Sequence, residues 1–256
     1  MTRVLSGAAL AAVALAAILF LPFIGLRIVA TLVALLAARE YLGIIHQDRR
    51  SPGAFVVLAL VAVVCWRFSM PGFVEVLGLL LAGLAWLAIE VLFRGLTVDR
   101  ASARFLAPWY IGMPFGMLAA IHAVGGRMAT LLLIATVVVS DTAQYYSGRT
   151  FGKRPLAPAI SPKKTIEGAV GGLIAASLFM TLVGGLVFPL ARPVSLVLLG
   201  VAIVVLGISG DLFESRLKRV AGIKDSSALI PGHGGVLDRI DALLFATPAY
   251  YLYLQA

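Results

Sequence analysis

The sequence predicts an all-α fold: a polytopic transmembrane helical bundle of about nine spans, with its N-terminus in the cytoplasm. Of the 256 residues, 61% are hydrophobic and only 13% are charged, whereas a soluble domain has about 45–50% apolar and about 25% charged residues. The apolar residues gather in runs near the length of about 20 that crosses a bilayer, and most basic residues lie between alternate runs. Together these features indicate a protein whose solvent is lipid.

Nine apolar runs are candidate spans. The third is the weakest, because only residues 54–66 are strictly apolar before Arg67. The second is interrupted by Arg39 and Glu40, and the last carries three charged residues near its start. The candidate spans are 4–24, 28–45, 54–68, 73–93, 105–124, 128–147, 168–190, 194–212 and 236–255.

The first run, from Val4 to Leu26, follows Arg3 and resembles a secretory signal peptide in that respect. It is longer than the roughly 7–15 residues of a signal-peptide apolar region. A second apolar run also follows almost at once. We therefore expect the segment to remain in the mature protein as the first span.

The basic side chains fall mostly on one side of a nine-span arrangement. The side shared by the N-terminus and the even-numbered loops collects fifteen Lys and Arg residues, against four on the other side: Arg27, Arg67, Arg127 and Arg192. This excess predicts a cytoplasmic N-terminus and a C-terminus across the membrane. The same rule, with attraction to anionic lipid headgroups, accounts for the net charge of +9. Because no basic stripe is interleaved with aromatics, we expect no nucleic-acid partner.

No linker, repeat or low-complexity stretch divides residues 1–256, so we expect a single integral membrane domain. Two polar segments, roughly 148–167 and 213–235, are longer than membrane connections require, and we expect them to be cytoplasmic loops. Cys65 is the only cysteine, which excludes an intramolecular disulfide and a cysteine metal site. Its apolar surroundings predict a small buried side chain.

The first of two candidate catalytic motifs covers residues 141–168. Asp141 follows ten uncharged residues, and an ionisable group inside or at the edge of a span is costly enough to indicate function. The residues after it combine glycines with cations, which suit close approach to phosphate oxygens: Gly148, Arg149, Gly152, Lys153, Lys163 and Lys164. The alternative is that these cations only set topology. Ser161-Pro162, followed by Glu167, also predicts a helix N-cap.

The second candidate catalytic motif covers residues 210–241. Asp211 and Glu214 are three residues apart, so a helix places them on one face, with Ser215 beside them. Asp238 and Asp241 repeat that spacing at the start of the last helix. The segment between these acidic helix ends contains a glycine-rich turn and four cations, Arg216, Lys218, Arg219 and Lys224.

These residue types predict a divalent metal together with phosphates. Carboxylates without cysteine select a hard cation such as Mg²⁺, which typically takes one or two carboxylates plus substrate phosphates. Lys and Arg then hold the remaining phosphate charge. The alternative is that the acids only form structural ion pairs. For His233 we favour positioning or phosphate contact over proton abstraction, because a phosphate monoester nucleophile is already anionic near neutral pH.

The run from Ser215 to Asp241 resembles the signature of the phosphatidate cytidylyltransferase (CDP-diacylglycerol synthase) family. It matches in order at Ser215, Lys218-Arg219, Lys224-Asp225, Pro231, His233-Gly234-Gly235, Asp238-Arg239 and Asp241. The upstream motif resembles the same family at Gly148-Arg149, Phe151-Gly152-Lys153 and Ser161-Pro162-Lys163-Lys164-Thr165. Gln144 departs from the small residue usual there, so we assign no role to the adjacent tyrosines. By motif, the resemblance covers about the last 120 residues.

This resemblance implies a multi-helix membrane fold, a Mg²⁺ requirement, and the conversion of CTP and phosphatidate into CDP-diacylglycerol and pyrophosphate. Asp211 and Asp238 become the expected metal ligands. The expected catalytic residues are Asp211, Asp238, Lys224, His233 and Asp141. The expected substrate-binding residues are Lys163, Lys164, Ser215, Lys218, Arg219, Asp225, Arg239 and Asp241. The site is expected to face the cytoplasm from the inner membrane, where soluble CTP meets a substrate anchored among membrane lipids.

Two other functions match part of this pattern. A CTP-dependent lipid kinase shares the need for metal and nucleotide, but its acceptor is an alcohol that requires a base. A transporter uses intramembrane carboxylates for protons or cations, whereas the charged motifs here fall in expected cytoplasmic loops. Finally, Gly168, Gly171 and Gly172 form a face of small residues that allows close helix packing within or between subunits, which leaves a homodimer open.

Overall fold

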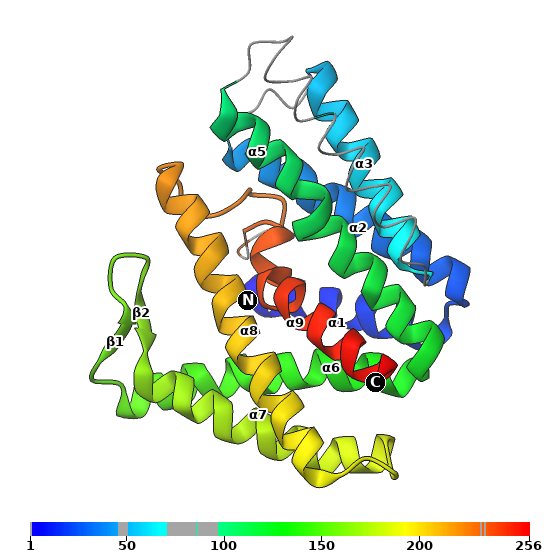
Figure 1. The fold of residues 1–256 in the computed structure, drawn as a ribbon. Coiled ribbons are helices and arrows are strands. Elements are labelled where there is room, and N and C mark those ends of the chain that lie inside the picture. The colour runs from blue at the N-terminus through cyan, green and yellow to red at the C-terminus, as the bar shows by residue number, and fades with distance from the viewer. Residues whose placement is uncertain (1, 46–50, 71–85, 87–96, 231, 233) are drawn as a thin grey trace. The chain divides into compact units, whose positions relative to one another are not determined.

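The computed structural model describes residues 2–45, 51–70, 86, 97–230, 232 and 234–256. It is almost entirely helical, as predicted, with one short β-hairpin that the all-α expectation omitted (Figure 1). The contacts divide the chain into two compact units. The first comprises Met1–Ala120 and Asp225–Leu237, and the second comprises Ile121–Lys224 and Asp238–Ala256. The single-domain prediction stays a prediction, and each unit is described by itself.

The first unit is built from apolar helices of the N-terminal half. Its elements are α1 (Thr2–Phe20), α2 (Phe23–Ile44), α3 (Pro52–Phe68), α5 (Val98–Ala107), the π-helical turn η1 (Pro108–Gly112) and the first turns of α6 (Met113–Phe151). Ser51 caps the N-terminus of helix α3, and its hydroxyl accepts a hydrogen bond from the Ala54 N–H at 3.2 Å. Cys65 is buried in α3, which confirms its predicted environment.

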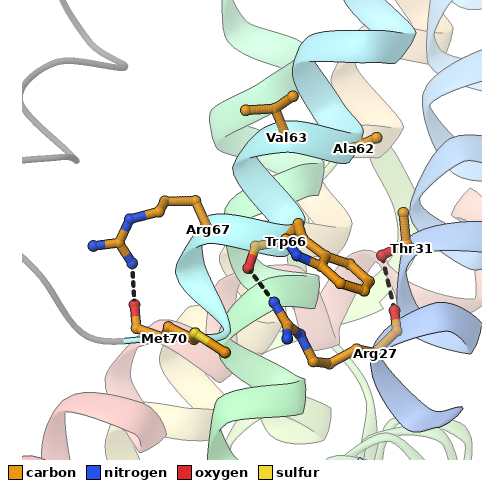
Figure 2. Close-up of a pocket in the computed structure, with 7 residues that line it drawn as sticks. All are labelled: Arg27, Thr31, Ala62, Val63, Trp66, Arg67 and Met70. Atoms are coloured by element: carbon orange, nitrogen blue, oxygen red, sulfur yellow. Dashed lines mark hydrogen bonds between the residues drawn. The ribbon is translucent and has the colours of Figure 1, made fainter. Parts of the chain in front are cut away.

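Helices α2 and α3 pack together, and a buried arginine joins them. The Arg27 guanidinium of α2 lies 3.8 Å from the Trp66 ring centroid and donates to the Trp66 carbonyl at 2.9 Å (Figure 2). Such a cation–π contact contributes about 0.5–2 kcal/mol. A pocket of about 600 Å³ opens beside this contact, with Thr31, Arg67 and Met70 among its lining residues. Among the described residues, no carboxylate lines this pocket. It therefore offers no carboxylate ligand for a metal ion.

The second unit contains the first candidate motif and both helical ends of the second, whereas residues 225–237 of the second motif belong to the first unit. Its elements are the rest of α6, strands β1 (Pro155–Ala157) and β2 (Ser161–Thr165), helices α7 (Ile166–Val187) and α8 (Pro193–Val220), and α9 (Leu237–Gln255) after its first residue. Strands β1 and β2 pair antiparallel, with Pro155 opposite Thr165 and Ala157 opposite Ser161. The hairpin projects beyond the end of α6 and the start of α7, and α7 packs along α8 (Figure 1).

Three described helical segments are long and apolar enough to cross a membrane: Asp99–Phe151, Ile166–Val187 and Pro193–Val220. The first has 53 residues and is broken at Gly126, where φ is 72°. Glycine adopts this left-handed conformation without steric cost. The break falls between the predicted spans 105–124 and 128–147. The predicted span 73–93 lies outside the described residues apart from Trp86.

Both predicted cytoplasmic loops are shorter in the structure than the sequence suggested. Helix α6 extends to Phe151, and the rest of the segment 148–167 forms the hairpin and the first turn of α7. Helix α8 continues to Val220, so the expected loop at 213–235 begins eight residues too early. The predictions were wrong here because a fall in hydropathy marks the membrane boundary, whereas a helix continues wherever its backbone bonds are satisfied.

Candidate active site

A polar pocket of about 480 Å³ lies within the second unit, between residues of α6, the hairpin, α7, α8 and α9. It brings together both candidate motifs, although they are separated in the sequence. Four aspartates line it, together with four basic residues: Asp141, Asp211, Asp238, Asp241, Arg149, Lys163, Lys164 and Arg239. All eight charged residues had been singled out from the sequence.

The first motif begins on the last turns of α6. Asp141 accepts a hydrogen bond from the Gln144 amide at 3.3 Å, and the same amide donates to the Ser140 hydroxyl at 2.9 Å. One turn later, the Arg149 guanidinium lies 3.3 Å from the Tyr145 hydroxyl. Because α6 stays helical here, Asp141, Gln144 and Tyr145 present their side chains to the pocket at helical spacing.

Glycines allow α6 and α7 to approach closely beside the pocket. A Cβ on Gly168 would lie 2.8 Å from the Gln144 carbonyl oxygen, and one on Gly172 would lie 2.5 Å from the Gln144 side chain. A Cβ on Gly171 would overlap the Ser147 hydroxyl. The small-residue face of α7 therefore packs within this chain, against the end of α6.

Thr165 caps α7, and the predicted cap at Ser161-Pro162 is wrong. The Thr165 hydroxyl accepts a hydrogen bond from the Gly168 N–H at 3.1 Å, whereas Ser161 begins strand β2. The hydroxyl at the true cap is three residues before Gly168, the spacing that lets a side chain reach an unpaired N–H of the first turn. Ser161 instead lies opposite Ala157 in the hairpin, four residues before the true cap.

Glu167 secures the segment that leads into the hairpin. Its carboxylate accepts hydrogen bonds from the backbone N–H groups of Lys153, at 3.0 Å, and Arg154, at 3.2 Å. These two residues lie between the end of α6 and the start of β1. The carboxylate thus joins the first turn of α7 to the start of the hairpin that carries Lys163 and Lys164 into the pocket.

Lys164 joins the first motif to the second. Its ammonium lies 2.6 Å from the Asp211 carboxylate. The other oxygen of Asp211 accepts a hydrogen bond from the Ser215 hydroxyl at 3.2 Å, which agrees with the helical spacing expected for these two residues. Both partners of the ion pair are partly open to solvent, with side-chain exposures of 20% and 34%. A ligand can therefore reach either group.

Lys218 bridges two acids at the end of α8. Its ammonium contacts Glu214 at 2.8 Å and Asp238 at 2.6 Å. The side-chain exposure is 11% for Lys218, 0% for Glu214 and 6% for Asp238. Among the described residues, the second carboxylate oxygen of Glu214 has no hydrogen-bond partner. The expected phosphate contact of Lys218 stays a prediction, while its observed contacts fix Asp238 relative to α8.

The remaining predicted residues occupy more open positions. Lys224 and Asp225 are exposed after α8 ends, and the Arg219 guanidinium reaches the Ile160 carbonyl of the hairpin at 3.4 Å. His233 and Pro231 lie outside the described residues. The role expected for His233 therefore stays a prediction.

The whole chain, residues 1–256, matches the model of the cytidylyltransferase family. The chain belongs to this family. A phosphatidate cytidylyltransferase of Bacillus subtilis is 38% identical over 216 residues, covering 79% of this chain and 78% of the relative. Another, of Haemophilus influenzae, is 46% identical over 138 residues, covering 50% of this chain and 46% of the relative. The uncharacterised protein YnbB of Escherichia coli is 40% identical over 131 residues, covering 51% of this chain and 44% of the relative. Apart from the Bacillus protein, these alignments span about half the length of the relatives.

A hard divalent cation fits the donor set of this cytidylyltransferase-family pocket. Its acidic residues offer carboxylate oxygens, the ligands that Mg²⁺ prefers. The negative charges of the four aspartates balance the positive charges of the four basic residues. The lining therefore has little net positive charge to neutralise a triphosphate. Among the described residues, no group of three or more acids, histidines or cysteines converges as a ready metal site. Substrate phosphates would therefore have to complete the coordination.

Sequence reasoning undervalued three residues of the candidate site. Gln144 was noted only as a departure from the family pattern, and Glu167 only as part of a cap. Glu214 was recognised on the acidic face but given no role. The signal for Glu214 was its position four residues before Lys218, which is the spacing of a helical ion pair.

Proposed function

We propose that this chain transfers the cytidylyl group of CTP to phosphatidate, forming CDP-diacylglycerol and releasing pyrophosphate. The observation that carries the proposal is the pocket of the second unit, where both family motifs meet with four aspartates and four basic residues. Membership of the cytidylyltransferase family and the names of the Bacillus and Haemophilus relatives support the same reaction.

The reaction is an in-line displacement at phosphorus. An oxygen of the phosphatidate phosphate attacks the α-phosphorus of CTP, forming a new P–O bond. The bond from that phosphorus to the oxygen bridging to the β-phosphate breaks, and pyrophosphate leaves with the electron pair. The attacking oxygen is anionic near neutral pH, so no general base is required. Positioning and charge neutralisation then supply most of the rate enhancement.

The basic side chains are suited to hold the phosphates. Lys163, Lys164 and Arg239 line the pocket directly, and exposed Lys224 is available to the triphosphate or the lipid phosphate. Charge-assisted hydrogen bonds of this kind are about twice as strong as neutral ones. Ser215, Arg219, Asp225 and Asp241 keep the substrate-binding roles expected from the family signature.

Mg²⁺ is the proposed cofactor, with Asp211 and Asp238 as its protein ligands. When bound, it would polarise the transferring phosphate and neutralise charge on the leaving group. Asp211 is partly exposed and bonded to Lys164, so its carboxylate can exchange that partner for a cation when a triphosphate draws the lysine away. Lys218 holds Asp238 against α8 and restricts its orientation.

We further propose nine spans, a cytoplasmic N-terminus, and a site facing the cytoplasm from the inner membrane. The distribution of basic residues supports this topology, and the three long apolar helices support a membrane location. This placement lets soluble CTP and a lipid-anchored phosphate reach one pocket. The glycine face of α7 is used against α6, so it gives no support to a homodimer.

The test uses purified protein, phosphatidate and CTP labelled separately in the cytosine ring and at the γ-phosphate. Cytosine label in the lipid product, with γ-label in released pyrophosphate, is the expected result. Transfer of the γ-label to an added polyprenol would instead identify a lipid kinase. If neither label enters lipid although the purified protein is folded, the proposed function is wrong.

A further inference from the structure

Glu40 is a buried acid in the last turns of the apolar helix α2. It is only 4% exposed, and its helix neighbours Ala37, Ala38 and Tyr41 are fully buried. A carboxylate in such surroundings is costly unless hydrogen bonds replace its water. In the sequence, this acid appeared only as an interruption of the second span.

Four hydrogen bonds converge on the Glu40 carboxylate, and all come from one loop of the same unit. One oxygen accepts from the Ser227 hydroxyl at 2.6 Å and the Val236 N–H at 3.0 Å. The other accepts from the Ser226 hydroxyl at 3.0 Å and the Leu237 N–H at 2.8 Å. Each oxygen therefore binds one residue from the beginning of the loop and one from its end.

The two backbone donors stand at the start of α9, which begins at Leu237. The first N–H groups of a helix have no partner within it, and an anion placed there also interacts favourably with the helix dipole. Glu40 thus serves as an N-terminal cap supplied by a different helix. The fit is tight, because a Cβ on Gly235 would lie 2.4 Å from a Glu40 carboxylate oxygen.

The loop that Glu40 binds also has hydrogen bonds of its own. The Ile230 N–H donates to the Gly234 carbonyl at 2.8 Å, and Gly234 has a φ of 81°. The Ser227 hydroxyl also accepts a hydrogen bond from the Leu229 N–H at 3.1 Å. A single carboxylate therefore binds residues at both ends of the loop 226–237.

We propose that Glu40 is a positioning residue for cytidylyl transfer, acting through the loop 226–237. By fixing the Val236 and Leu237 amides, it sets where α9 begins and hence the backbone from which Asp238 extends. Asp238 follows Leu237 directly in the chain. Glu40 itself bonds only to the loop in the described residues and needs no contact with substrate. This inference rests on the proposed function, since the role concerns that reaction.

Glu40→Gln is the sharpest test because it keeps the size of the side chain. The carboxamide retains one oxygen acceptor, but its NH₂ group faces two donors, so two of the four hydrogen bonds are lost. We expect amide hydrogen exchange at Val236 and Leu237 to accelerate by about tenfold or more, while exchange in α7 and α8 is unchanged. We expect kcat per folded enzyme to fall roughly tenfold to a hundredfold, as misplacement by about 1 Å can cause.

Arg39→Gln is the matched control, because Arg39 is the exposed neighbour of Glu40 on α2. It should leave both exchange and kcat at wild-type values. Ser227→Ala removes one hydroxyl donor and should give a smaller change in the same direction, which keeps the test valid if Glu40→Gln folds poorly.

Three outcomes decide the proposal. Faster exchange with a lower kcat in folded enzyme supports it. Unchanged exchange, or faster exchange with wild-type kcat, overturns the positioning role while leaving the proposed function intact. Absence of cytidylyl transfer in the wild-type protein removes the proposed function, and the role of Glu40 in it, even if the exchange data show that Glu40 anchors the loop.

Discussion

Replacing Lys218 with Met should destabilise the protein strongly, because the lysine is the shared partner of two buried acids. Its ammonium lies 2.8 Å from Glu214 and 2.6 Å from Asp238, and both acids are less than a tenth exposed. Removing one partner of a buried ion pair costs about 3–5 kcal/mol, because a charge is left without compensation. Two hydrogen bonds to charged groups, at about 1.5–3 kcal/mol each, give a similar total.

The measurement is the thermal unfolding midpoint of the purified protein in detergent. For a chain of this size, each kcal/mol lowers the midpoint by about 2–4 °C, so the expected decrease is roughly 6–20 °C. Lys153→Met is the matched control, because Lys153 is exposed in the segment between α6 and β1 and should change the midpoint little. A double variant, Glu214→Gln with Lys218→Met, replaces the fully buried acid with a neutral side chain and should recover part of the loss. Equal midpoints for Lys218→Met and Lys153→Met would refute the reasoning.

Three further predictions concern the site and the topology. Lys224→Ala should lower kcat/KM about tenfold to a hundredfold without changing the melting midpoint; wild-type kinetics would leave Lys224 with a topological role only. Asp211→Asn and Asp238→Asn should each reduce turnover severely and raise the Mg²⁺ concentration needed, and the double variant should be little worse than the worse single one. An active Asp238→Asn enzyme with an unchanged Mg²⁺ response would contradict the metal assignment. Single cysteines at Ser161 and Gln255, in a cysteine-free background, should react from opposite faces of the membrane; labelling of both from one face would count against nine spans.

Local spacing allowed much of the site to be predicted from the sequence. Asp211 and Ser215 are four residues apart, and their side chains do bond across one turn of α8. Asp238 and Asp241 both reach the same pocket from α9. Such contacts depend only on the 3.6-residue period of a helix, so they follow as soon as the segment is known to be helical.

Contacts between residues far apart in the sequence could not be predicted from helical spacing. The pairing of Lys164 with Asp211 joins residues 47 positions apart, and it depends on a hairpin that the hydropathy pattern does not reveal. The bonds from Glu40 to Ser226 and Leu237 span 186 and 197 positions. In the sequence, Glu40 was noted only as a charged interruption of an apolar run, and only the tertiary structure identifies what it binds.

The close contact between α6 and α7 also affects how mutational tolerance should be interpreted. Gly168 lies on the pocket wall, yet a Cβ there would lie only 2.8 Å from a backbone oxygen. Even alanine should therefore be rejected at this position for steric reasons, without any contact to a phosphate. In a saturation-mutagenesis screen scored by growth, Gly168 would resemble a catalytic residue. Asp211 and Gly168 would be told apart only by assays that separate the amount of folded protein from the activity of each molecule.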